Sequence, residues 1–225
     1  MTRSSNISAL TDRLARLDPH ERHLIGLTGA PGAGKSTVSE LLAEQLGSSL
    51  VVIPMDGFHL ASSVIAGTPL AARRGAPDTF DADGFIALLR RLRNQLEPVV
   101  YAPRFDRTIE DPIAGSIAVH SEVPFVLVEG NYLLHAVPPW SGVADFLDET
   151  WYLELNNDSS RVDRLIARHV EYGKSTEASE RFVRTSDEPN AELIALSRSR
   201  ADLVVIERED GTLSTETPSS RRQRR

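Results

Sequence analysis

Residues 29–36 read Gly-Ala-Pro-Gly-Ala-Gly-Lys-Ser and match the phosphate-binding pattern G-x-x-x-x-G-K-[ST]. A short apolar run, Leu24–Thr28, precedes this loop, and a segment with apolar residues at helical spacing follows it. Glycines let the backbone turn so that successive N–H groups point at one anion, and the start of a helix adds partial positive charge there. A loop of this kind between a strand and a helix predicts a phosphate site in an α/β framework.

We assign the phosphate contacts to the loop and the residue after it: Gly29, Ala30, Pro31, Gly32, Ala33, Gly34, Lys35, Ser36 and Thr37. The Lys35 ammonium is expected to reach the β- and γ-phosphates of ATP, and the Ser36 hydroxyl to ligate Mg²⁺. We therefore expect Lys35 to be catalytic as well as nucleotide-binding.

The rest of the chain alternates apolar runs with segments of helical period, which is typical of a parallel sheet with crossover helices. The predicted fold is an α/β P-loop NTPase fold with three layers and a five-stranded parallel sheet. Near-continuous apolar runs indicate strands covered on both faces, and we predict five: Leu24–Thr28, Leu50–Met55, Phe125–Glu129, Trp151–Leu155 and Leu203–Ile206.

We expect residues 1–212 to form a single domain that opens with a helix within residues 1–22. Apolar residues at helical spacing also predict a helix around residues 38–46 and another around residues 85–96, the latter with Asp83 as N-cap. Residues 99–119 interrupt the pattern: two β-like pieces, Val99–Ala102 and Ile117–Val119, flank a polar loop. We interpret this segment as a substrate-side insertion, and residues 213–225 as a flexible basic tail.

Composition excludes several classes of protein. The chain has 225 residues, a net charge of −7 and no cysteine, so disulfide scaffolds, zinc–thiolate sites and cysteine nucleophiles are excluded. An acidic chain is a poor candidate for binding nucleic acid, where phosphate neutralisation supplies much of the affinity. No apolar run approaches the length that crosses a bilayer, and the first residues lack a signal-peptide core. We expect a cytoplasmic protein that binds neither membrane nor nucleic acid.

Two carboxylates end predicted strands. In open α/β sheets, ligands bind beyond the carboxyl ends of the strands, so Asp56 and Glu129 are expected to face the crevice. Asp56 can accept the proton of an attacking hydroxyl or cap the next turn through an Asx bond, and the residues alone leave both open. Glu129 can hold Mg²⁺, directly or through a water, or bond a loop N–H. We count Glu129 among both the metal and the acceptor-side residues.

At these positions the chain resembles a known family. The loop at 29–36 combines with four segments that carry the resemblance: Met-Asp-Gly-Phe-His (55–59), Arg-Arg-Gly-Ala-Pro-Asp-Thr-Phe-Asp (73–81), Tyr-Ala-Pro-Arg-Phe-Asp-Arg (101–107) and Val-Glu-Gly-Asn-Tyr-Leu-Leu (128–134). They are similar to P-loop kinases of the uridine kinase, bacterial pantothenate kinase and phosphoribulokinase group, nearest the nucleoside/nucleotide kinase-like or fructose-transport-system kinase branch. The resemblance covers about Leu24 to Ile206.

The resemblance implies that Asp56 is the catalytic carboxylate and that His59, Arg74 and Tyr101 lie in segments around the acceptor. Read without the family, His59 is more often structural than chemical. Arg104 and Arg107 can be surface ion-pair residues, or they can hold an anionic or polyhydroxyl acceptor. The Asp-Gly-Phe-His-Leu run departs from the pantothenate kinase pattern, and uridine kinases usually lack the Asp-Gly-Phe form. The resemblance also implies that homodimers are common in this group.

Residues 158–186 are the predicted lid. The segment Asp158–Val170 has an apolar stripe and an arginine stripe at helical spacing, and on residue pattern alone the arginine stripe is usually a solvated face. In the family that the chain resembles, an arginine-rich helix closes over ATP. The resemblance therefore implies Arg168 first and Arg164 second as nucleotide contacts, with Arg168 catalytic. Lys174 follows in a flexible turn where it can contact phosphate.

We conclude from the sequence that the chain is an ATP- and Mg²⁺-dependent transferase, a kinase acting on a hydroxyl of a small metabolite such as a sugar, nucleoside or vitamin precursor. The alternative is a regulatory or chaperone-type P-loop NTPase that hydrolyses nucleotide without an acceptor. A third class, a nucleotide-binding module without turnover, also remains open.

Overall fold

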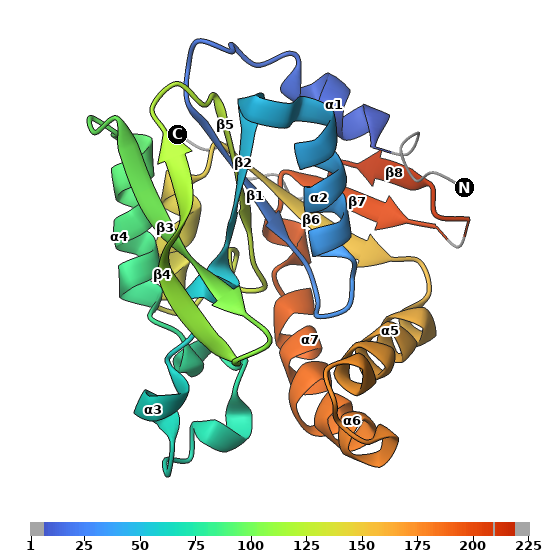
Figure 1. Cartoon of the computed structure of the whole chain (residues 1–225). Helices are drawn as coiled ribbons and strands as arrows, with labels where there is room; N and C mark the ends of the chain where they lie inside the picture. The colour runs from blue at the N-terminus through green and yellow to red at the C-terminus, as the bar shows by residue number, and fades with distance from the viewer. Residues whose placement is uncertain (1–6, 209, 219–225) are drawn as a thin grey trace.

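The computed structural model describes residues 7–208 and 210–218. Its centre is a six-stranded sheet with the strand order β2-β5-β1-β6-β7-β8 (Figure 1). The parallel strands are β1 (His23–Thr28), β2 (Leu50–Pro54), β5 (Phe125–Glu129), β6 (Glu149–Leu155) and β7 (Leu203–Glu207). All five predicted strands are therefore confirmed.

The strand count needs one correction. Strand β8 (Leu213–Glu216) pairs antiparallel with β7 and makes the sheet six-stranded rather than five-stranded. These residues belong to the segment 213–225 that we predicted to be a flexible tail, and the prediction is wrong for them. An edge strand needs only a row of backbone partners on one side, so a polar composition is no bar to it. The arginine-rich residues 219–225 lie outside the described residues.

Helices cover both faces of the sheet. Alternate residues of β1 and β5 point to opposite faces, and they divide the core into two clusters. On one face, Leu27 and Leu127 pack in a cluster with residues of α1 (Ser8–Leu14) and α2 (Lys35–Leu46). On the other face, Leu24 and Val126 share a cluster with residues of α4 (Ala82–Arg93) and the 3-10 segment Trp140–Phe146.

Two predicted helix boundaries differ from the structure. Helix α4 begins after Asp81, whose carboxylate accepts a hydrogen bond of 2.8 Å from the Gly84 N–H, so Asp81 and not Asp83 is the N-cap. The helix ends at Arg93, and Leu96 beyond it is 96% exposed instead of continuing the apolar stripe. Both aspartates lie near the helix start, and only the backbone geometry of Asp81 aims a carboxylate at the free N–H groups.

The insertion is a β-hairpin. Strands β3 (Val99–Asp106) and β4 (Asp111–His120) pair along almost their whole length and form a sheet of their own. The predicted β-like pieces were correct but too short, and the predicted polar loop at 103–116 is mostly strand. A register shift between Ala102 and Arg104 interrupts the alternation of apolar and polar residues, which hides the strand in the sequence. The short helix α3 (Ser62–Ile65) lies on the same side of the molecule (Figure 1).

The predicted lid, residues 158–186, is helical and lies on the opposite side. It comprises α5 (Asp158–Glu171), α6 (Thr176–Phe182) and most of a π-helical segment (Val183–Asp187). Helix α7 (Glu188–Ala195) continues from this segment beyond the predicted bounds, and we include it in the lid. In Figure 1 these helices lie below the sheet, across from α3 and the tip of the hairpin. None of the helices in the described ranges is long and apolar enough to cross a membrane.

Candidate active site

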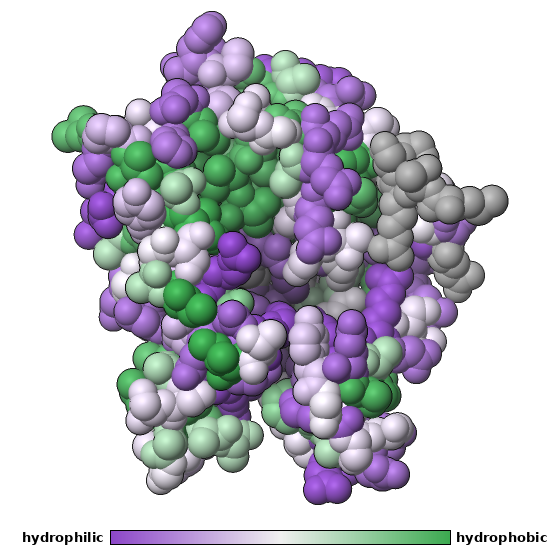
Figure 2. Space-filling model, viewed as in Figure 1, coloured by the Kyte–Doolittle hydropathy of each residue, from purple (hydrophilic) through white to green (hydrophobic). Residues whose placement is uncertain are grey.

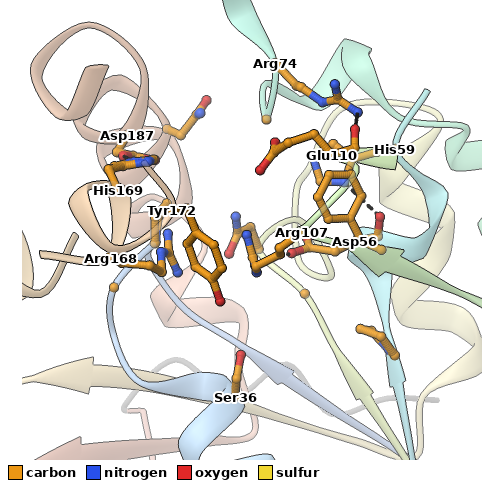
Figure 3. Close-up of a pocket in the computed structure, with 18 of the residues that line it drawn as sticks. Ser36, Asp56, His59, Arg74, Arg107, Glu110, Arg168, His169, Tyr172 and Asp187 are labelled. Carbon is orange, nitrogen blue, oxygen red and sulfur yellow. Dashed lines mark hydrogen bonds and ion pairs between the residues drawn. The ribbon is translucent and has the colours of Figure 1, made fainter. Parts of the chain in front are cut away.

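A cleft of about 420 Å³ lies at the carboxyl ends of the parallel strands, between the hairpin and the helices of the lid (Figures 2 and 3). Because the carboxyl ends of parallel strands meet at one edge, residues far apart in the sequence converge there. The cleft brings together these predicted site residues: Pro31, Gly32, Lys35, Ser36, Asp56, His59, Arg74, Arg107, Glu129, Arg168 and Lys174.

The P-loop has the backbone conformation that its glycines predict. Gly32 and Gly34 have φ angles of +79° and +93°, in the left-handed region that favours glycine. A Cβ at Gly32 would lie 2.9 Å from the carbonyl oxygen of Arg161, so the loop packs closely against the first turn of α5. Helix α2 starts at Lys35, and its free N–H groups supply the positive end predicted for a phosphate site.

The Lys35 ammonium is buried under its own loop. Its Nζ donates hydrogen bonds of 2.9 and 3.0 Å to the carbonyl oxygens of Gly29 and Ala30. Burial lowers the pKa of Lys35 to about 8, and the charges of Glu129 and Asp56 offset part of this shift. The ammonium therefore stays protonated at neutral pH but is poorly hydrated, which suits it to an incoming phosphate.

The two oxygens predicted to hold metal lie side by side. Ser36 Oγ donates a hydrogen bond of 2.7 Å to Glu129 Oε1, although the residues are 93 positions apart. Ser36 is the second residue of α2, and Glu129 ends β5. A hydroxyl and a carboxylate are hard oxygen donors of the type that Mg²⁺ prefers, and Mg²⁺ bound with phosphates needs few protein ligands. The residues present thus fit the ion.

Asp56 follows β2 in the 3-10 turn Met55–Phe58 and faces the cleft. The next residue, Gly57, lies under the hairpin: a Cβ on it would be 2.4 Å from the carbonyl oxygen of Pro103. Glycine is required here by close approach, because a side chain would push the hairpin off the Asp56 turn. The Asp56 carboxylate accepts a hydrogen bond of 3.3 Å from Arg107 Nη2.

His59 is half-buried beside Asp56, between two aromatic rings. Its Nδ1 lies 2.8 Å from the Asp56 carbonyl oxygen, which only accepts, so Nδ1 carries the proton. The rings of Phe80 and Phe105 lie 4.0 and 4.7 Å from the imidazole, centroid to centroid. Burial lowers the pKa of His59, and the nearby Asp56 charge opposes this shift. The ring is therefore neutral at pH 7 and joins the Asp56 turn to the hairpin.

The other predicted acceptor residues have different positions. Arg74 lines the cleft, but it donates to Ser62 Oγ, to the Glu110 carbonyl oxygen and to Asp111, so its guanidinium holds the hairpin tip to α3. Arg104 lies in an adjoining groove of about 440 Å³ that shares Asp56, Ser36 and Glu129 with the cleft. Tyr101 is 60% exposed and does not line the cleft.

The lid arginines play three different roles. The Arg168 guanidinium points into the cleft and forms no hydrogen bond or ion pair with any residue that the structure describes (Figure 3). Burial, together with repulsion from Arg107, lowers the pKa of Arg168. Arg164 pairs with Glu207 at 3.0 Å outside the cleft, with Nη1 3.5 Å from the Cβ position at Gly34. Arg161 is buried, so the reading of the whole stripe as a solvated face is wrong for it.

The cleft also contains lid residues that sequence reasoning missed, above all His169, Tyr172 and Asp187. His169 Nε2 donates to Asp187 Oδ2 at 2.9 Å, and Lys174 Nζ donates to His169 Nδ1 at 3.2 Å. Three segments of the lid are thereby tied together. Asn131 and Asn190 line the cleft as well. Asn131 follows Glu129 by two residues, so the strand-end rule that found Glu129 could have found it.

The fold and this site define a P-loop kinase, and comparisons with known proteins agree. A Schizosaccharomyces pombe protein named "Putative uridine kinase C227.14" is 39% identical over 80% of this chain and 81% of its own. The Escherichia coli protein YggC is 34% identical over 88% of this chain and 83% of its own. The crystal structure of a "putative fructose transport system kinase" from Silicibacter sp. TM1040 superposes with a TM-score of 0.78 at 36% identity, covering 91% of this chain and 98% of that one.

The chain belongs to this family of P-loop kinases. It is an ATP-dependent kinase, a phosphotransferase with an alcohol group as acceptor. No family model matches the chain. The structure of YFH7 from Saccharomyces cerevisiae, at 18% identity and a TM-score of 0.74, shares the fold. The family resemblance and the α/β P-loop fold that the sequence predicted are therefore confirmed.

Proposed function

We propose that the kinase transfers the γ-phosphoryl group of ATP, bound with Mg²⁺, to a hydroxyl of a small metabolite placed beside Asp56. The observation that carries this proposal is that three groups converge on one cleft: the P-loop lysine Lys35, the carboxylate Asp56 after β2, and the lid arginine Arg168. Among the described residues, the Arg168 guanidinium has no hydrogen-bond or ion-pair partner. A sugar, a nucleoside and a vitamin precursor all carry the required hydroxyl.

In this proposal Asp56 accepts the proton of the acceptor hydroxyl as its oxygen attacks the γ-phosphorus, and the bond to the β-phosphate oxygen breaks to release ADP. Lys35 and Arg168 stabilise the charge on the transferring group from the P-loop side and from the lid side. Ser36 and Glu129 would hold Mg²⁺, which supplies charge neutralisation at the phosphates when bound. Mg²⁺ dependence, like these roles, is part of the proposal.

The arginines on the side of the cleft where the acceptor would bind favour an acceptor that carries a phosphate or carboxylate. Both terminal nitrogens of Arg74 are engaged by Ser62, Glu110 and Asp111, and its Nε is buried. The guanidinium of Arg107, in contrast, has Asp56 as its one polar partner among the described residues. Arg107 therefore has donors left for a ligand. Tyr101 has no role in this proposal, because its side chain lies outside the cleft.

The test is a screen for ADP release from Mg·ATP with sugars, nucleosides and vitamin precursors, each with and without an anionic group. Lys35→Met and Asp56→Asn serve as inactive controls, and thermal melting checks that both variants fold. We expect one acceptor class to stimulate turnover and both substitutions to abolish that stimulation. If both variants phosphorylate the acceptor at the wild-type rate, the proposed roles are wrong. High hydrolysis that no acceptor changes would instead support the NTPase alternative.

A further inference from the structure

Arg107 sits against the carboxylate that we propose as the base. It belongs to the turn that joins β3 to β4, and its Nη2 donates to Asp56 Oδ2 at 3.3 Å. Across residues 7–208 and 210–218, the Arg107 guanidinium makes no other hydrogen bond or ion pair. The two side chains are 39% and 36% exposed, so water reaches the pair and the pair can open.

Two aromatic rings bracket the same guanidinium. Its central carbon lies 5.9 Å from the centroid of Phe105 on the hairpin and 5.8 Å from that of Tyr172 at the end of α5. Figure 3 shows Arg107 between the lid and the Asp56 turn. Cation–π contacts of this length favour this position for the guanidinium. They leave its N–H groups free to bind other ligands. Phe105 of the hairpin and Tyr172 of the lid thus both favour this position of Arg107 beside Asp56.

Fold stability does not account for this placement. The neighbouring cation Arg74 bonds three groups and ties two segments together, whereas Arg107 links the hairpin tip to a carboxylate at the bottom of the cleft. A half-exposed pair of this kind adds little to stability. Its position affects chemistry instead, because it occupies one oxygen of the proposed base.

We propose that Arg107 keeps Asp56 from activating water while the cleft lacks an acceptor, and so directs the phosphoryl group to the acceptor rather than to hydrolysis. This inference rests on the proposed function, because it assigns the base role to Asp56. In the suppressed reaction a water O–H bond breaks and its proton passes to Asp56. The water oxygen bonds to the γ-phosphorus, the bond to the β-phosphate oxygen breaks, and ADP and inorganic phosphate leave.

The geometry of the pair opposes this step. Arg107 Nη2 donates to Asp56 Oδ2 and so fills the direction in which a water would donate its proton to that oxygen. An acceptor removes this obstruction if it offers its own oxygens to Arg107. The guanidinium then moves from Asp56 to the acceptor as the acceptor hydroxyl takes the vacated place.

The test measures ADP release from Mg·ATP without any acceptor, in wild type and in Arg107→Gln. We expect the variant to hydrolyse ATP about two- to five-fold faster, the range that one half-exposed ion pair permits. Arg91→Gln is the matched control: Arg91 also forms an exposed ion pair, with Glu97 at 3.0 Å, but on α4 away from the cleft. It should hydrolyse ATP at the wild-type rate. Arg107→Lys, which keeps the charge and loses the planar fork, should lie between wild type and Arg107→Gln.

The double variant Asp56→Asn/Arg107→Gln separates the outcomes. Under our inference it falls back to the rate of Asp56→Asn alone. If Arg107→Gln melts like wild type and hydrolyses no faster, the inference is overturned, and the proposed function survives as long as Asp56→Asn still abolishes acceptor phosphorylation. If the double variant stays as fast as Arg107→Gln, Asp56 is not the group that Arg107 restrains, and the inference is overturned as well. If Arg107→Gln misfolds, Arg107→Lys decides by the same comparison.

Discussion

Replacing Arg161 by methionine should both destabilise the fold and weaken nucleotide binding. Arg161 is buried on the inner side of α5, and its guanidinium donates to Asp158 at 2.6 Å, to Glu188 at 2.5 Å and to the Pro31 carbonyl oxygen at 3.3 Å. One side chain thus connects the lid helix, α7 and the P-loop. Methionine keeps the apolar stem and removes all of these bonds.

The magnitude follows from the exposure of the partners. Removing one member of a buried ion pair costs about 3–5 kcal/mol because the other charge is left without a partner. The Asp158 side chain is 77% exposed and rehydrates at little cost, whereas the Glu188 side chain is 35% exposed and rehydrates only in part. We therefore expect a loss of about 2–3 kcal/mol in the free energy of unfolding. For a domain of this size that lowers Tm by about 4–12 °C.

Thermal melting followed by circular dichroism measures the loss, and titration with a non-hydrolysable ATP analogue measures binding. The Kd for the analogue should rise several-fold, because the P-loop carbonyl loses its donor and α5 loses its anchor. Arg91→Met is the control for stability. Arg91 lies on α4 in an ion pair with Glu97 that is exposed on both sides, and its loss should cost less than about 1 kcal/mol. A Tm drop below about 2 °C for Arg161→Met, with unchanged Kd, would refute the reasoning.

Three further predictions concern single positions. Glu110 has a φ of +55° in the hairpin turn, so Glu110→Gly should raise the free energy of unfolding by up to about 1 kcal/mol, measured by denaturant titration; destabilisation would count against backbone strain. Gly57→Ala brings a Cβ to 2.4 Å from the Pro103 carbonyl oxygen and should impair acceptor phosphorylation while analogue binding stays within about two-fold; an unchanged kcat/KM for the acceptor would contradict it. Because phosphate favours protonated Lys35, whose pKa is about 8, analogue affinity should fall by up to about tenfold per pH unit above pH 8; a Kd constant from pH 7 to 10 would exclude this.

The sequence predicted best what depends on strand order and strand ends. Five apolar runs identified the parallel strands, and the rule that their carboxyl ends share an edge brought the P-loop, Asp56 and Glu129 to one cleft. These features depend on local hydrophobicity and on the small number of ways in which parallel strands with crossover helices can be arranged. The edge strand β8 was missed because its stability comes from backbone pairing with β7, which leaves no apolar pattern in Leu213–Glu216.

Side-chain partners across the lid could not be predicted in the same way. Arg161 and Arg164 belong to the same arginine stripe of α5. Arg161 is nevertheless buried against α7, whereas Arg164 pairs at the surface with Glu207. Which of them turns inward depends on how α7 packs on α5. The segment Val183–Asp187 is π-helical, so it has more residues per turn than the α-helices on either side of it. Asp187, at its end, lies within hydrogen-bond distance of His169. Sequence period carries no signal for a single π-turn, so this contact was beyond prediction.

The charge of the chain illustrates why a global count says little about a site. With a net charge of −7 the whole molecule repels ATP weakly, but at physiological ionic strength charges farther away than about 8 Å are largely screened. What matters is the set of cations within that distance of the phosphates. The chain has 25 basic residues, of which two are lysines, and both lysines line the cleft. Arginine holds its carboxylate partners tightly through a fork of donors, whereas a lysine ammonium is a compact charge that exchanges partners readily. Lys35 holds two carbonyl oxygens and Lys174 an imidazole nitrogen of His169, and neither lysine is paired with a carboxylate, so each can give up its partners to a phosphate.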